Sequence, residues 1–165
     1  ALWSKTLQSD NWSRRCLEKM SFDPQTVTYS DELESSSQTR SAAAGGAVLP
    51  PRQEMLFPMC VTNEASNVFH TLHGGMLMAL VSITTSLHVT QQFEAEPMID
   101  RSSVSVSTQF LKAAPCGTLM TAFTRIDKMD KSMVFSSVRF CHRDDSSIVF
   151  ATGTHVEAVK RKVDF

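Results

Sequence analysis

Residues 67–75 read Asn-Val-Phe-His-Thr-Leu-His-Gly-Gly and lead directly into Met-Leu-Met-Ala-Leu-Val at residues 76–81. The apolar stretch predicts a helix whose first residues are Gly74 and Gly75. The first amides of a helix have no partner within the helix and carry partial positive charge. Glycines at that place let a ligand approach the backbone closely. The stretch therefore predicts a turn that binds an anion or polarises a carbonyl oxygen.

The helix that starts at Gly74 is expected to run to about His88 and to be buried on all sides, because its first half has almost no polar residues. A polar connection is expected over residues 91–100, which include Pro97. Before the turn, residues 55–61 predict a strand. The central element of the fold is thus one apolar helix.

The last third of the chain predicts strands. Residues 103–107 read Ser-Val-Ser-Val-Ser, the alternation of a half-buried strand, and residues 118–127, 133–141 and 148–159 are the next candidates. Turn residues at 130–132 and 143–147 separate them, which favours an antiparallel meander. The fold class is α+β, with an antiparallel sheet wrapped around one long central helix.

The N-terminal third has a different composition. Residues 1–20 place apolar side chains four or five positions apart, which predicts an amphipathic helix that either packs on its own domain or docks a partner: Trp3, Leu7, Trp12, Cys16 and Met20. Residues 31–53 are rich in Ser, Ala, Gly and Pro and predict a loop or extended arm. We therefore divide the chain into an N-terminal helix and low-complexity arm, 1–53, and a main domain, 54–165.

Composition narrows the function classes. The net charge is −1, so nucleic acid is not an expected partner, and the longest apolar run, residues 76–83, is too short to span a bilayer. The four cysteines form no Cys-x-x-Cys pair, which disfavours zinc and a disulfide framework. No metal or cofactor is predicted. The chain begins at Ala1 rather than Met, which fits either a removed targeting segment and a mitochondrial location or a truncated cytoplasmic chain.

The combination of Asn67, His73-Gly74-Gly75, an apolar helix and Ser-Val-x-Val at 103–106 resembles the hotdog-fold acyl-CoA thioesterases. The similarity is greatest to the phenylacetate-pathway type and the thioesterase superfamily members, and it covers roughly residues 54–159. Residues 131–138 also resemble the hairpin of that family. The resemblance implies a hotdog fold, acyl-CoA as ligand and no cofactor.

The resemblance also implies roles for single residues. The Gly74 amide would polarise the thioester carbonyl, Asn67 would position the attacking water or the thioester, and Ser103 would support the water site. His73 would hold the loop in shape near the carbonyl, although from the residues alone it is equally a brace of a tight turn. His70 is expected to be a loop residue that narrows the entrance.

One position departs from the family. Nine residues after His73 the family carries an acidic residue that acts as base or nucleophile, and here that position is Ser82. A serine hydroxyl takes no proton from water near neutral pH without a base beside it. Ser82 is either a nucleophile activated by an unidentified histidine or a serine bonded to helix carbonyls. Among loop acids that could replace the carboxylate, Glu64 is preferred over Glu94 and Asp100.

Gly74 and Ser82 are eight residues apart on one helix, about 12 Å, so a site that uses both positions needs two chains. We therefore expect a homodimer or a higher hotdog assembly. Three functions follow: an acyl-CoA thioesterase, whose hydrolysis Ser82 disfavours; an inactive hotdog subunit that binds or supports a larger assembly such as a mitochondrial one; and, last, an enoyl-CoA hydratase. The hydratase ranks last because the sequence shows no Asp and His pair of that kind.

Overall fold

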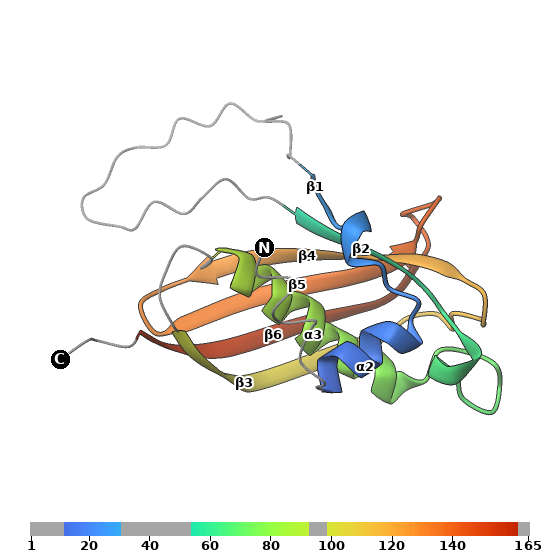
Figure 1. The fold of residues 1–165 in the computed structure, drawn as a ribbon, viewed down its shortest axis with the longest axis horizontal. Coiled ribbons are helices and arrows are strands. Elements are labelled where there is room, and N and C mark those ends of the chain that lie inside the picture. The colour runs from blue at the N-terminus through green and yellow to red at the C-terminus, as the bar shows by residue number, and fades with distance from the viewer. Residues whose placement is uncertain (1–11, 31–53, 93–98, 162–165) are drawn as a thin grey trace.

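The computed structural model describes residues 12–30, 54–92 and 99–161, in which one antiparallel sheet carries a long helix across one face (Figure 1). The strands are β1 (Thr28–Ser30), β2 (Glu54–Cys60), β3 (Ile99–Phe110), β4 (Leu119–Met129), β5 (Met133–His142) and β6 (Val149–Arg161). The helices are α2 (Trp12–Lys19) and α3 (Gly74–Gln92), with short 3-10 turns η1 (Pro24–Thr26) and η2 (Asn63–Ala65). The strand order is β1-β2-β4-β5-β6-β3.

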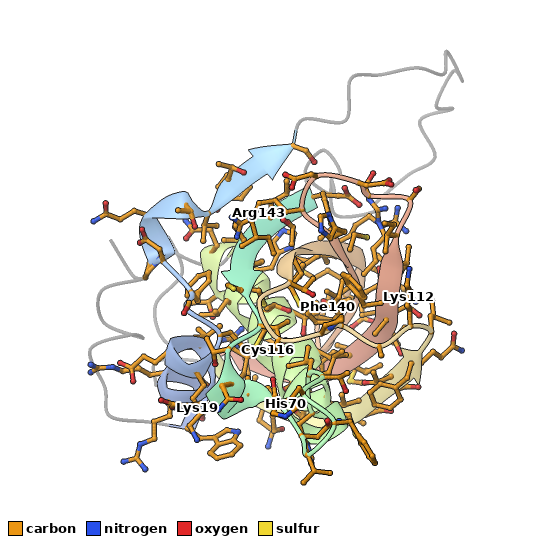
Figure 2. The ribbon with its side chains drawn as sticks, turned by 90° about the vertical axis from the view of Figure 1, so that its right-hand side faces the viewer. Lys19, His70, Lys112, Cys116, Phe140 and Arg143 are labelled. Atoms are coloured by element: carbon orange, nitrogen blue, oxygen red, sulfur yellow. The ribbon has the colours of Figure 1, made fainter. Side chains whose placement is uncertain are left out.

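The sheet buries the face that lies against α3. In β2 every second side chain is fully buried, and these are Met55, Phe57 and Met59. In β5 Phe140 lies inside the molecule, while Lys112 and Arg143 lie at its periphery (Figure 2). This period of two in burial is typical of a strand with one buried face. The predicted α+β fold class is confirmed.

Helix α3 approaches the sheet closely at one point. A Cβ atom added to Gly153 of β6 would lie 2.5 Å from Val81 Cγ2. Only a residue without a side chain fits beneath Val81 there, so Gly153 sets the distance between helix and sheet. The helix also extends to Gln92, beyond the predicted end at His88, because no breaker residue precedes residue 93.

The prediction that α3 is buried on all sides is wrong. Met78 is 45% exposed and Gly75 is exposed, so one side of the first half of α3 faces solvent. The sheet covers the opposite side, where Leu77, Leu80 and Val81 are buried. An apolar sequence shows no polar stripe, and so it could not reveal which side stays uncovered.

The predicted meander is confirmed for β4, β5 and β6 and is wrong for β3. Strand β3 pairs with β6, three strands away from β4, which follows it in the chain. The connection after Phe110 crosses the end of the sheet, where the amides of Leu111 and Lys112 donate to Phe150 O (2.9 and 3.0 Å). As a result β3 forms an edge, and within the described residues no strand pairs with its outer side.

The N-terminal helix packs on the core. Cys16, Leu17 and Met20 are buried in the same apolar cluster as the residues of α3 and the sheet, whereas Trp12 is 70% exposed. This packing favours the alternative in which the N-terminal helix packs on the domain formed by the sheet and α3, over the alternative in which it docks a partner. Trp3, Leu7, the arm at 31–53, and residues 93–98 lie outside the described residues, and the predicted domain boundary after residue 53 stays a prediction. No helix in the described ranges is long and apolar enough to cross a membrane.

Candidate functional site

The Asn67 side chain closes the loop that leads into α3. Its Oδ1 accepts hydrogen bonds from the amides of Phe69 (2.9 Å) and Thr71 (3.3 Å), and its Nδ2 donates to Thr71 Oγ1 (3.0 Å). Both ends of the amide group are therefore engaged within the loop. The role of Asn67 toward a water or a thioester stays a prediction.

His73 caps the start of α3. Its Nδ1 accepts from the Gly75 amide at 3.0 Å, and its carbonyl oxygen accepts the first helical hydrogen bond, from the Leu77 amide at 3.1 Å. The Gly74 amide lies before that first bond and finds no acceptor among the described residues. An unpaired donor with the partial charge of a helix start can therefore receive a ligand oxygen.

One aromatic ring lies against this helix start, and two apolar side chains are exposed in the loop before it. The ring of Phe110, at the end of β3, is 3.5 Å from the point where a Cβ of Gly74 would be. Phe110 is 57% exposed, and Val68 and Phe69 in the preceding loop are 86% and 80% exposed. His70, in the same loop, has a left-handed backbone (φ 56°) and is exposed, as expected of a loop residue.

Ser82 is half-buried on α3, and its hydroxyl makes no hydrogen bond to a described residue. The bonds back to helix carbonyls that were expected of Ser82 are made by Thr84, Thr85 and Thr90 (2.7, 2.6 and 2.7 Å). No histidine in the described part of the chain bonds to Ser82. Within one chain the structure therefore leaves Ser82 without a base and about 12 Å from Gly74.

A chain of hydrogen bonds joins β3, β6 and α3. Ser103 Oγ lies 2.8 Å from His155 Nε2, and His155 Nδ1 lies 2.8 Å from Thr85 Oγ1. His155 is fully buried, whereas Ser103 is exposed at the sheet edge. The pairing of β3 with β6 shifts register between Ser103 and Ser105, and such bulges redirect side chains. The structure thus places the predicted site residue Ser103 on a buried imidazole.

A buried carboxylate lies beside this imidazole. Glu157 is 4% exposed, and its Oε1 accepts from Ser86 Oγ at 2.8 Å. Its Oε2 has no hydrogen-bond partner among the described residues and lies 4.0 Å from His155 Nδ1. Arg101 Nη1 lies 4.0 Å from Glu157 Oε1 and donates to Ser86 O (2.8 Å). Glu157 is therefore held by the helix and by one cation.

Both buried histidines are neutral near pH 7. Burial lowers the pKa of His155, while Glu157 raises it and Arg101 lowers it. Burial also lowers the pKa of His88 from 6.5 to about 4, although a hydrogen bond with Thr124 raises it. An unprotonated imidazole keeps one ring nitrogen as an acceptor, which a base requires.

Sequence reasoning missed His155, Glu157 and Thr85. Thr85 and His155 are separated by 70 positions and Ser103 and His155 by 52, so no local spacing could join them. One signal was available. In β6 the positions of one parity face the core, and His155 and Glu157 share that parity with Gly153 and Val159. Polar residues on the core face of a strand require partners.

None of the three loop acids that could replace the missing carboxylate is buried within the described residues. Glu64 is exposed in η2, Asp100 is exposed at the start of β3, and Glu94 lies outside the described residues. Glu157, in contrast, is the register partner of the predicted site residue Ser103 in the pairing of β3 with β6. No cluster of three or more His, Cys, Asp or Glu side chains in the described ranges is arranged to hold a metal ion.

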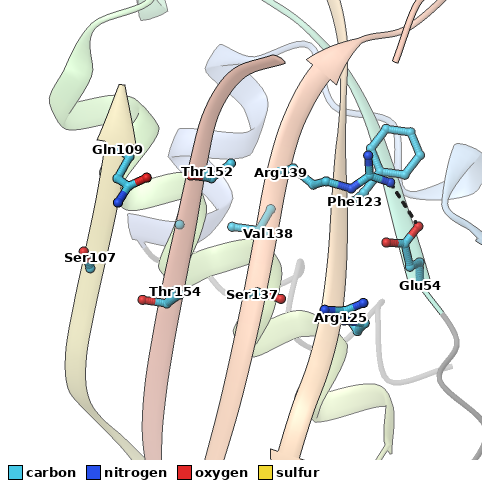
Figure 3. Close-up of a pocket in the computed structure, with 11 residues that line it drawn as sticks. Glu54, Ser107, Gln109, Phe123, Arg125, Ser137, Val138, Arg139, Thr152 and Thr154 are labelled. Atoms are coloured by element: carbon cyan, nitrogen blue, oxygen red, sulfur yellow. Dashed lines mark hydrogen bonds and ion pairs between the residues drawn. The ribbon is translucent and has the colours of Figure 1, made fainter. Parts of the chain in front are cut away.

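A groove of about 440 Å³ lies on the other face of the sheet, away from α3 (Figure 3). Arg139 in this groove is 3.4 Å from Glu54 and stacks over the Phe123 ring, 4.8 Å from its centre. Arg125 pairs with Asp127 at 2.9 Å. None of the predicted site residues lines the groove, and its arginines are already paired, so we place the candidate site on the α3 side.

Known structures share this fold. Thioesterase superfamily member 2 from zebra fish matches 96% of this chain and 94% of that chain, with a TM-score of 0.67 and 20% identity. A hypothetical thioesterase protein from Streptococcus pneumoniae, solved with coenzyme A, matches 67% of this chain and 81% of that chain, with a TM-score of 0.59 and 17% identity. The hotdog fold implied by the sequence resemblance is thereby confirmed.

Sequence comparison gives a weaker link. A Pseudomonas aeruginosa protein named "putative esterase" is 26% identical over 102 residues, 62% of this chain and 74% of that protein. No family profile matches the chain. The resemblance to thioesterase-like hotdog proteins is therefore carried chiefly by the fold.

Proposed function

We propose that this protein binds acyl thioesters of coenzyme A at the start of α3 and hydrolyses them slowly. The observation that carries the proposal is the Gly74 amide, which precedes the first helical hydrogen bond and has no acceptor among the described residues. A backbone donor at a helix start stabilises the negative charge that develops on a carbonyl oxygen under attack. The shared fold with solved thioesterases supports this chemistry.

Two further observations favour an acyl-CoA ligand. The Streptococcus pneumoniae neighbour, which shares the fold, contains coenzyme A in its structure. In the present chain, Phe110 lies against Gly74, and Val68 and Phe69 are exposed in the loop before α3. An apolar surface at the carbonyl-binding amide suits the acyl chain of a thioester.

The site would be completed by a second copy of the chain. Ser103 is seven residues from Phe110 on β3, about 20 Å or more along an extended strand, so one copy cannot place Ser103 and Gly74 on the same carbonyl. The outer edge of β3 has no paired strand within the described residues, and Val104 on it is 60% exposed. Antiparallel pairing of two β3 edges, with Ser103 opposite the partner's Phe110, would bring Ser103 toward the partner's Gly74.

Slow hydrolysis follows from Ser82. A positioned general base contributes about 10²- to 10⁴-fold to such reactions, and Ser82 carries no carboxylate. The same residue favours a second candidate function, an inactive hotdog subunit of a larger assembly such as a mitochondrial one. Acyl-CoA binding separates the two candidates.

The test measures binding and turnover separately. Binding of a non-hydrolysable thioether analogue of decanoyl-CoA is followed by calorimetry, and thiol release from acetyl-, decanoyl- and palmitoyl-CoA is followed by absorbance. We expect analogue binding, slow release with at least one substrate, and a gain of about 10-fold or more in Ser82→Asp. Ser82→Asn is the matched control, since it has similar size but no carboxylate, and it should show no gain.

Two results would contradict the proposal. A chain that binds no analogue and releases no thiol supports the inactive subunit instead. Fast native turnover that Ser82→Asp leaves unchanged would contradict slow hydrolysis. Sedimentation at the assay concentration tests the paired site, because a monomer that hydrolyses acyl-CoA would rule it out.

A further inference from the structure

We propose that Ser103 and His155 form a nucleophile and base pair, and that the Ser103 hydroxyl carries the acyl group during turnover. The substrate, an acyl thioester, rests on the function proposed above. The pair itself rests on geometry, because Ser103 Oγ lies 2.8 Å from His155 Nε2 at the exposed edge of the sheet. This is the contact that activates a serine hydroxyl.

The direction of the hydrogen bonds fixes the imidazole in the form that a base needs. A threonine hydroxyl has a single hydrogen, and Thr85 donates it to Val81 O at 2.6 Å. Toward His155 Nδ1, 2.8 Å away, Thr85 can therefore only accept, so Nδ1 carries the hydrogen. In a neutral ring Nε2 then has the lone pair, and Ser103 donates to it.

The surroundings keep this imidazole neutral at rest. Burial lowers the pKa of His155, and the charged groups that face it are Glu157 of β6, which raises the pKa, and Arg101 of β3, which lowers it. On the β5 side its register partner is the uncharged Ser136. On α3 the other titratable group, His88, bonds to Thr124 of β4 instead.

Glu157 is placed to stabilise the protonated form. Its Oε2 is buried, has no hydrogen-bond partner among the described residues and lies 4.0 Å from His155 Nδ1. An unpartnered carboxylate oxygen at that distance gains an attractive partner when the ring becomes an imidazolium. Glu157 and Thr85 thus act as positioning residues, in the way that a third group orients the base of a triad.

The reaction has two steps. In the first, Ser103 Oγ attacks the thioester carbon, His155 Nε2 takes the hydroxyl proton, and the carbon–sulfur bond breaks as that proton passes to the coenzyme A sulfur. In the second, water attacks the Ser103 ester, His155 takes a water proton and returns it to Ser103 Oγ, and the free acid leaves. No oxidant, reductant or cofactor is consumed.

The first experiment looks for the acylated serine. The full chain is mixed with decanoyl-CoA, quenched in acid and analysed by intact mass and peptide mapping. We expect a mass gain equal to one decanoyl group on Ser103. Ser103→Ala should lose the adduct and slow thiol release by about 10²-fold or more. Ser105→Ala, an exposed serine of the same strand, should keep both.

The second experiment tests the base with a matched control. His155→Gln should slow acylation by about 10²-fold or more, whereas His88→Gln removes an equally buried histidine that also bonds a threonine and should leave the rate per folded molecule unchanged. In the wild type the rate should fall at acidic pH as His155 becomes protonated. Glu157→Gln should move that fall to lower pH, because Glu157 raises the pKa of His155.

The outcomes separate this proposal from the one it rests on. If the thioether analogue does not bind, the proposed function fails. If the analogue binds but the wild type forms no adduct, or Ser103→Ala releases thiol at the wild-type rate, only the nucleophile fails. Equal losses in His155→Gln and His88→Gln would show a structural role for His155 and would overturn the pair.

Discussion

The two halves of α3 differ in whether their polar groups have hydrogen-bond partners. The first half, through Val81, has only apolar residues and glycine, yet its Gly74 amide has no acceptor in the described part of the chain and Met78 is exposed. The second half is largely buried, yet apart from Ser82 its threonine, serine and histidine side chains bond to helix carbonyls or to β4 and β6: Thr84, Thr85, Ser86, His88 and Thr90.

The comparison shows where reactivity can arise in a small fold. Buried polar side chains are tolerated when each one is bonded, and then they are rigid. An open helix end is the reverse case, because its first amide has no helical acceptor and can donate its hydrogen to a ligand oxygen. In this protein Thr85 in the second half of α3 bonds to His155, and the first half begins with the Gly74 amide. Both halves therefore contribute to the proposed site.

Removing the Gly74 hydrogen should have the largest effect. Gly74→Pro deletes the N–H at the first helical position, where proline is well tolerated. We expect acyl-CoA hydrolysis to fall by about 10²- to 10³-fold, the usual loss for one oxyanion donor, with circular dichroism unchanged. Gly74→Ala is the control, because it keeps the N–H and its Cβ would contact Phe110 at an ordinary 3.5 Å. Equal activity in the two variants would remove Gly74 from the mechanism.

The second largest effect is expected at Val81, where the two halves of α3 meet and Gly153 of β6 packs against the helix. Gly153→Ala would force a Cβ to within 2.5 Å of Val81 Cγ2 and 3.1 Å of Ser107 O. We expect the free energy of unfolding to fall by about 3 kcal/mol in urea titrations. Adding Val81→Ala should recover part of that loss, since it removes the clashing methyl groups. A double variant less stable than Gly153→Ala alone would show that the helix does not rest on this contact.

Acid should weaken the second half of α3. The pKa of His88 is about 4 in the folded protein against 6.5 ordinarily, so the unfolded chain binds the proton more readily. The stabilisation from neutral His88 is complete above pH 6.5 and is lost as the pH falls toward 4, about 2 kcal/mol of it by pH 5. Urea titrations between pH 4 and 7.5 measure this slope. His88→Gln should flatten it, and an unchanged slope would contradict the assignment.

The smallest effect is expected on the open side of α3. Met78→Ser should change the free energy of unfolding by less than about 0.5 kcal/mol, because the side chain is 45% exposed. Leu80→Ala, two residues further and fully buried, should cost about 2–5 kcal/mol. A large loss in Met78→Ser would show that a second molecule covers this side at the concentration used, and dilution would then reduce it.

Most strands and the helix could be predicted because their signals are local. The predicted strand at residues 55–61, the alternation at residues 103–107 and the turn residues at 130–132 and 143–147 are local signals that mark β2, β3 and the ends of β5. The place of β3 could not be predicted, because strand order depends on the path of residues 111–118 across the sheet and not on the pattern inside the strand.

The candidate site residues divide in the same way between local and long-range signals. His73 and Gly74 were proposed from the local turn and Ser103 from the family resemblance, and their roles stay predictions. The cap formed by His73 follows directly from its position before a helix. His155 was not found, because its bonds to Thr85 and Ser103 exist only after β6 has paired with β3 and packed under α3. Polar residues on the core face of a strand are the sequence feature that indicates such buried hydrogen bonds.

The outer edge of β3, unpaired within the described residues, predicts that the behaviour of this protein depends on its concentration. Along the twelve residues of β3, the backbone donors and acceptors that point away from β6 are satisfied by water in a dilute chain. Any strand that pairs with them stabilises the folded state by mass action, so melting temperature and specific activity should both rise with protein concentration. Melting temperatures and rates of this protein can therefore be compared only at a stated protein concentration.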